Sequence, residues 1–186
     1  MHVADAQREV RAAFLGGFMG QLVSGTLWLA SAVLATWGTP RQAITVLVVG
    51  GFFIFPLTQL GLRLLGHRGA LSKENPLQGL GMQVAFTLPL SLPVVGAAAL
   101  YRLEWFYPAF MVVLGAHYLP FVFLYGMRMF AVLCALLVSG GIWLAIQGPT
   151  EFSAGAWITG VVLLAFAFLG RALVAREGGT EGTTGR

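Results

Sequence analysis

Charged side chains are scarce in this sequence, and their scarcity excludes a soluble domain. Only 10% of the 186 residues are charged, whereas 58% are hydrophobic and the mean hydropathy is +0.82. A soluble domain carries roughly a quarter charged residues and alternates polar with apolar stretches. The composition is therefore that of an integral membrane protein.

Cysteine and clustered metal ligands are also lacking. The single cysteine, Cys134, lies in an apolar run, so there is no disulfide framework and no CxxC or CxxxH spacing. The histidines, His2, His67 and His117, are too scattered to suggest a metal site. A lone interior histidine without a CxxCH sequence also argues against haem. We therefore expect neither a metal nor a cofactor.

Apolar segments of membrane-spanning length fill most of the chain. A stretch of about 20 apolar residues crosses the hydrocarbon core of a bilayer. Thr39-Pro40 and Asn75-Pro76 have the cap-plus-proline pattern that starts a helix. The sequence predicts an all-α fold, a single domain (1–176) of six transmembrane helices, followed by a disordered cytoplasmic tail (177–186). The predicted helices cover about 12–37, 41–65, 76–100, 106–127, 129–147 and 153–175.

The basic residues predict how these helices are oriented. An even number of crossings places both termini on one side, and all of the 11 Lys and Arg residues except Arg41 and Arg102 fall on that side. Because Lys and Arg accumulate in cytoplasmic loops, we expect both termini in the cytoplasm. The formal net charge of +4 is accounted for by this bias, and we expect no nucleic-acid partner.

Several polar side chains fall inside the predicted helices. If the helices form a bundle, lipid excludes these groups and they should converge on a pocket near the midplane, which would bind a small lipophilic or uncharged ligand. Interhelical hydrogen bonds also hold bundles together without any ligand, so both interpretations stay open. Membrane lipids are the expected partners, and the mass of 19.8 kDa and glycine-rich first helix allow a homodimer. The candidate ligand-binding residues are His117, Tyr118, Gln83, Thr87, Gln59 and Gln21.

His117 is the one ionisable side chain near the middle of the apolar run 106–127. Burial disfavours the imidazolium, and no Asp or Glu lies within any predicted helix to offset that cost. We therefore predict a neutral ring, which argues against a carboxylate–histidine proton relay. A neutral ring can still anchor a hydrogen bond or act as a general base.

Two segments of the sequence resemble a known family. Asn75-Pro76-Leu77 opens one predicted helix, and Gly115-Ala116-His117-Tyr118-x-Pro120 lies inside the next. This pattern resembles a family of small bacterial six-helix membrane proteins catalogued only as a domain of unknown function. The resemblance covers about a third of the chain. It implies a multi-pass protein of the bacterial cytoplasmic (inner) membrane and supplies no substrate.

The predicted architecture also resembles the androgen-induced-type intramembrane lipid hydrolases, six-helix proteins thought to use a Thr and a His on different helices. That likeness implies Thr58 as a nucleophile activated by His117. The surrounding sequence does not match that family, and no oxyanion donor can be named, so catalysis is the weaker hypothesis. The hypotheses are a binding or transport protein for a lipophilic or uncharged solute, the hydrolase, and a non-catalytic scaffold or accessory subunit.

Overall fold

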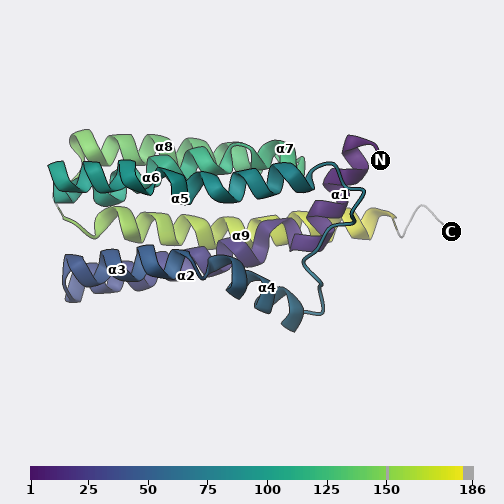
Figure 1. Ribbon diagram of the computed structural model, residues 1–186, viewed down its shortest axis with the longest axis horizontal. Helices are drawn as coiled ribbons and strands as arrows, with labels where there is room; N and C mark the ends of the chain where they lie inside the picture. The colour runs from purple at the N-terminus through teal and green to yellow at the C-terminus, as the bar shows by residue number, and fades with distance from the viewer. Residues whose placement is uncertain (150, 182–186) are drawn as a thin grey trace.

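The computed structural model describes residues 1–149 and 151–181, with side chains described as far as residue 177. Every regular element in these residues is a helix (Figure 1). Five helical segments are long and apolar enough to cross a membrane, or up to six if the bent pair α3 (Pro40–Gly51) and α4 (Ile54–Leu64) counts as one span. The predicted all-α fold is therefore confirmed, with helices long and apolar enough to span a membrane.

The other segments of spanning length follow the predicted order along the chain. The first combines a short polar helix, a 3-10 turn and a longer apolar helix; the charged residues of the polar helix precede the predicted span 12–37 and lie outside it. The third combines a 3-10 turn with two helices. In chain order these are α1 (Val3–Phe14), η1 (Leu15–Gly17) and α2 (Phe18–Trp37); α5 (Gln78–Tyr101); η2 (Leu103–Trp105), α6 (Phe106–Tyr118) and α7 (Phe121–Tyr125); α8 (Met129–Gln147); and α9 (Ala154–Glu181).

The helices pack as two groups joined through α9 (Figure 1). The most extensive contacts join α2 to α9 and α6 to α8, while α3 packs on α2 and α5 packs on α6. Aromatic rings fill the junction, where Trp28 of α2 contacts Tyr107 and Phe110 of α6. The start of α1 and the C-terminal end of α9 lie at the same end of the bundle (Figure 1).

The first predicted helix is interrupted between α1 and α2. Leu15, Gly16 and Gly17 all have positive φ angles, of 52°, 64° and 83°, which an α-helix cannot accommodate. A Cβ on Gly16 would lie 2.8 Å from the carbonyl oxygen of Gly170, so the break also allows close approach to α9. The charged helix α1 is thereby turned away from the axis of the apolar α2 (Figure 1).

Prolines interrupt two further helices that the sequence predicts as continuous. In a continuous helix the ring of Pro56 would clash with the carbonyl four residues earlier, that of Phe52. The chain instead bends by 60° between α3 and α4. Pro120 has the same relation to Ala116, whose carbonyl accepts instead from the Leu119 N–H at 3.2 Å. The predicted helices 41–65 and 106–127 are each two helices for this reason.

Of the two helix starts predicted from a capping residue followed by proline, one is confirmed and one is not. Thr39 and Gln42 form a reciprocal capping box with Pro40 in the first turn of α3, so that start is confirmed. Asn75 does not cap α5, because Leu77 occupies the cap position and the Asn75 side chain accepts from the Leu77 N–H instead. At the C-terminus, α9 continues to Glu181, into the segment predicted to be disordered, and residues 182–186 lie outside the described residues.

Candidate functional site

A hydrogen bond between α5 and α6 joins two of the predicted site residues. The Thr87 hydroxyl oxygen lies 2.9 Å from Nδ1 of His117 and 2.7 Å from the carbonyl oxygen of Val84. Donation from a helical threonine to the carbonyl three residues earlier is a common local bond. The pair therefore has a defined geometry, in which one hydroxyl contacts both a carbonyl oxygen and a ring nitrogen.

The His117–Thr87 pair is open to the surface of the protein. Thr87 is exposed and His117 is half-buried, and no hydrogen bond to Nε2 of His117 forms within the described residues. A different interhelical bond, between Ser31 of α2 and Tyr107 of α6, provides the comparison. Those hydroxyls are 2.6 Å apart and both residues are fully buried. A bond that only joins helices is expected to resemble the Ser31–Tyr107 pair.

Tyr118 borders the pair but points into the core. Its ring lies 5.6 Å from the His117 ring and stacks on Phe130 of α8 at 6.1 Å. Phe121 contacts both neighbours, with its ring 5.2 Å from His117 and 5.3 Å from Tyr118. Tyr118 is buried, so its main role is to support the histidine from behind. Phe121 is a site residue that the sequence analysis missed.

The two predicted glutamines on α5 and α2 are in contrasting positions. Gln83 is exposed one turn before Thr87 and makes no hydrogen bond within the described residues. Gln21 is only 2% exposed, and neither amide atom has a hydrogen-bond partner within those residues. Gln83 therefore shares the open face of the Thr87 side chain, whereas Gln21 is an unsatisfied group in the core of the bundle.

The remaining candidates lie on α4, which the structure does not bring to His117. α4 packs against α2, on the far side of α2 and α9 from α5 and α6 (Figure 1). Gln59 donates to the carbonyl of Gly69 at 3.1 Å, in the segment that follows α4. The Thr58 hydroxyl faces Gly20 of α2 and has no hydrogen-bond partner within the described residues. The hydroxyl that contacts His117 is that of Thr87, so the geometry offers no support for a Thr58–His117 nucleophile pair.

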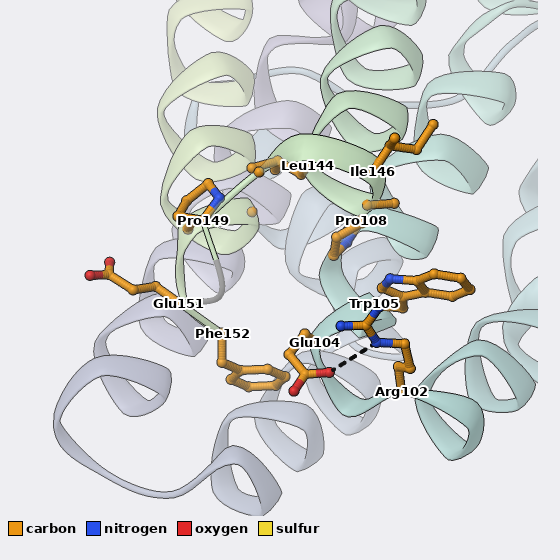
Figure 2. A pocket seen from close by; sticks show the side chains of 13 residues that line it. Arg102, Glu104, Trp105, Pro108, Leu144, Ile146, Pro149, Glu151 and Phe152 are labelled. Carbon is orange, nitrogen blue, oxygen red and sulfur yellow. Dashed lines mark ion pairs between the residues drawn. The ribbon is translucent and has the colours of Figure 1, made fainter.

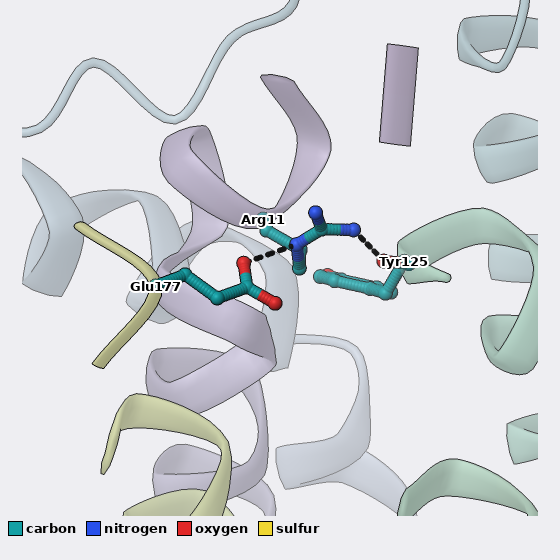
Figure 3. Close-up of polar contacts among 3 residues, drawn as sticks. All are labelled: Arg11, Tyr125 and Glu177. Atoms are coloured by element: carbon teal, nitrogen blue, oxygen red, sulfur yellow. Dashed lines mark hydrogen bonds and ion pairs between the residues drawn. The ribbon is translucent and has the colours of Figure 1, made fainter. Parts of the chain in front are cut away.

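A second polar cluster, also missed by the sequence analysis, ties α1 to the rest of the bundle. Figure 3 shows Arg11 between α9 and the end of α7. Its Nε donates to the Glu177 carboxylate at 2.9 Å and its Nη1 donates to the Tyr125 carbonyl at 2.7 Å. Gln7 adds a bond to the Phe123 carbonyl at 2.6 Å. The short polar helix thus clamps segments that are distant in the sequence.

Glu9 extends this clamp to the segment between α4 and α5. Its carboxylate accepts from the Ser72 N–H at 2.5 Å, the Ser72 hydroxyl at 3.1 Å and the Asn75 amide at 2.9 Å. The Ser72 backbone donor, with help from Asn75, holds the pKa of Glu9 below its ordinary value of 4.5. Asn75 also donates to the Ala6 carbonyl at 3.1 Å, so the Asn75-Pro76-Leu77 motif is a structural joint.

A pocket of about 190 Å³ lies at the opposite end of the bundle, where η2 and α6 meet the segment between α8 and α9 (Figure 2). Arg102 pairs with Glu104 at 3.8 Å and lies 5.5 Å from the centre of the Trp105 ring. Both members of the Arg102–Glu104 pair are about half exposed. The one cation that lines this pocket, Arg102, is therefore already paired with a neighbouring carboxylate, and His117 is not among the lining residues.

The fold and the polar pair together define the class of protein. It is all-helical in the described residues, has helices apolar enough to cross a membrane, and carries an open hydrogen-bonding pair on one face. Residues 3–172 match the model of a family of unknown function, DUF7010. The chain belongs to that family, which confirms the resemblance inferred from the Asn75 and His117 segments. No curated protein and no solved structure matches the chain.

Proposed function

We propose that this protein is a multi-pass protein of the bacterial cytoplasmic membrane that binds a small lipophilic or uncharged molecule at the His117–Thr87 pair. The observation that carries the proposal is the unused Nε2 of His117 on an open face of a helix of spanning length. Polar groups that face lipid without a partner are costly, because the hydrocarbon core supplies no hydrogen bonds. A bound molecule with one polar group would remove that cost.

The surroundings of the pair support an uncharged ligand that enters from the bilayer. α5 and the segment from α6 to α7 contain no Asp, Glu, Lys or Arg. Most of the spanning window of α5 is not buried within the protein. Phe86, the residue before Thr87, and Leu90, three residues after it on the same helix, are 58% and 77% exposed. A molecule dissolved in the bilayer can therefore reach the pair sideways, without passing through the bundle.

The proposed orientation has both termini in the cytoplasm, on the side of most Lys and Arg residues. Single cysteines placed at Lys73 and Glu104 in a Cys134→Ala background test it. A membrane-impermeant thiol reagent added to intact cells should label the cysteine at position 104, and should label that at 73 only after permeabilisation. The reverse pattern would show the opposite orientation.

The proposed function is tested by what the protein retains on purification. Native mass spectrometry of the wild type should show a small lipophilic species that is absent from His117→Ala. Thr87→Val, which removes the other member of the pair, should also lose the species. Thr26→Val is the matched control for Thr87→Val, because Thr26 is also an exposed threonine bonded to its own helix, at 2.8 Å from the Leu22 carbonyl. The control should keep the species. Equally empty wild type and His117→Ala would contradict the proposal.

A further inference from the structure

The hydrogen-bonding pattern around Thr87 carries an inference about the ligand, which rests on the proposed function. The Thr87 hydroxyl has one hydrogen but lies within bonding distance of two atoms, the Val84 carbonyl oxygen and Nδ1 of His117. A carbonyl oxygen can only accept, whereas each nitrogen of a neutral imidazole is either a donor or an acceptor. Whether Nδ1 of His117 carries a hydrogen is therefore inferred from the atoms that it contacts.

Only one assignment satisfies both contacts. If Nδ1 were unprotonated, the single hydrogen of the Thr87 hydroxyl could be donated to Nδ1 or to the Val84 carbonyl oxygen, but not to both. At the contact without that hydrogen, the lone pairs of two acceptors would face each other. If Nδ1 carries the hydrogen, it donates to the Thr87 oxygen, and the Thr87 hydroxyl donates to Val84. In a neutral ring this leaves Nε2 without a hydrogen, so Nε2 is an acceptor.

The acceptor is available from outside the bundle. Nε2 makes no hydrogen bond within the described residues and is not among the fully buried polar atoms there. We propose that the site selects uncharged membrane-soluble alcohols, whose hydroxyl donates to Nε2 of His117 while the hydrocarbon tail lies along α5. An ether, ester or ketone of the same size has no hydrogen to donate and should bind less well.

The protonated nitrogen can be observed directly. Protein labelled with 15N-histidine and held in lipid nanodiscs should give a His117 signal with Nδ1 protonated and Nε2 bare, assigned by its loss in His117→Asn. A His117 signal with Nε2 protonated would overturn the inference, because the open nitrogen would then be a donor. This measurement needs no ligand, so it does not depend on whether the proposed function is correct.

Ligand class is tested with hexadecanol and its methyl ether, titrated into detergent-purified protein and followed by native mass spectrometry. The alcohol should bind about threefold to fifteenfold more tightly, the range that one hydrogen bond in a membrane provides. Equal or tighter binding of the ether would overturn the inference while leaving the proposed function in place. If neither compound binds, the inference about alcohols is overturned, whereas the proposed function stands or falls with the species that the wild type retains on purification.

The variant His117→Asn separates ligand binding from helix packing. Its side-chain amide can replace Nδ1–H as the donor to Thr87 but places no acceptor where Nε2 lies. Thermal stability should stay near that of the wild type, whereas hexadecanol affinity should fall to that of the ether. Unchanged hexadecanol affinity would overturn the inference. So would a variant that loses a homodimer of the wild type but still binds hexadecanol, because the face would then contact a second copy of the protein.

Discussion

At the residue scale, Asn75 shows how a short motif serves structure without serving the candidate site. Its side-chain amide donates to the Ala6 carbonyl and the Glu9 carboxylate, and its oxygen accepts from the Leu77 N–H. Asn75 is only 3% exposed, so water cannot reach its polar atoms and these protein bonds satisfy them instead. The motif fixes where α5 begins relative to α1.

Replacing Asn75 with Ala should therefore destabilise the protein. The change leaves the Leu77 N–H without a partner and removes one donor from the Ala6 carbonyl and one from the Glu9 carboxylate. An unpaired buried N–H costs about 1–3 kcal/mol. Ser72→Ala is the milder variant, because the backbone N–H of Ser72 still donates to Glu9. Reversible unfolding in mixed micelles should rank the wild type first, Ser72→Ala second and Asn75→Ala last. Equal stabilities would show that the joint contributes nothing.

Glu9 should make the stability of this joint depend on pH. Hydrogen bonds lower its pKa in the folded protein, so the ionised form favours folding. The contribution is fully present above the ordinary carboxyl pKa of 4.5 and is lost as the pH falls through the lower folded value. Melting temperatures measured from pH 7 downward should fall more steeply in the wild type than in Glu9→Gln. Parallel curves would contradict this account.

The sequence identified part of the candidate site because membrane depth makes polar residues conspicuous. His117 and Thr87 were both predicted and are bonded to each other. Gln59 and Gln21 were predicted on the same grounds, but one bonds to Gly69 and the other is buried without a partner. Depth can be estimated from a sequence, whereas the direction in which a helix face points depends on its neighbours.

At the element scale, the helix interruptions have causes that are visible in the sequence. Pro56 and Pro120 each remove a backbone donor and crowd the carbonyl four residues earlier, which explains the two breaks. Pro89 and Pro93 lie inside α5 without breaking it. A proline therefore marks where a break is permitted, and packing decides whether it forms.

The junction between α1 and α2 should be sensitive to a single methyl group. Gly16→Ala would hold alanine at a φ of 64°, costing about 1–2 kcal/mol, and would place its Cβ 2.8 Å from the Gly170 carbonyl oxygen. Gly96→Ala is the control, because Gly96 lies within α5 and a Cβ there meets nothing within 4 Å. Thermal unfolding should show Gly16→Ala destabilised by at least that amount.

The control variant should behave in the opposite way. Alanine has the higher helix propensity, so Gly96→Ala should be neutral or more stable by up to about 1 kcal/mol. If both variants melted at the temperature of the wild type, close packing of η1 against α9 would not be required for stability.

At the scale of the whole molecule, hydrophobicity specifies the spans but not their arrangement. The predicted helices appear at nearly the predicted positions, because long apolar runs have few alternatives to a membrane helix. The separation of α4 from α5 and α6 by α2 and α9 could not be predicted (Figure 1). It depends on contacts between residues far apart in the sequence, such as Gly16 with Gly170.

The central claim is that the face carrying Thr87 and His117 lies deep in the bilayer and is open to lipid. A nitroxide attached to a cysteine at position 86, which is 58% exposed beside Thr87, tests it in a Cys134→Ala background. Power saturation in liposomes should show high accessibility to oxygen and low accessibility to a water-soluble nickel complex, the reverse of a label at position 73. Higher nickel than oxygen accessibility at position 86 would place the site in water, and low accessibility to both would show that protein covers it. Either result would contradict the account.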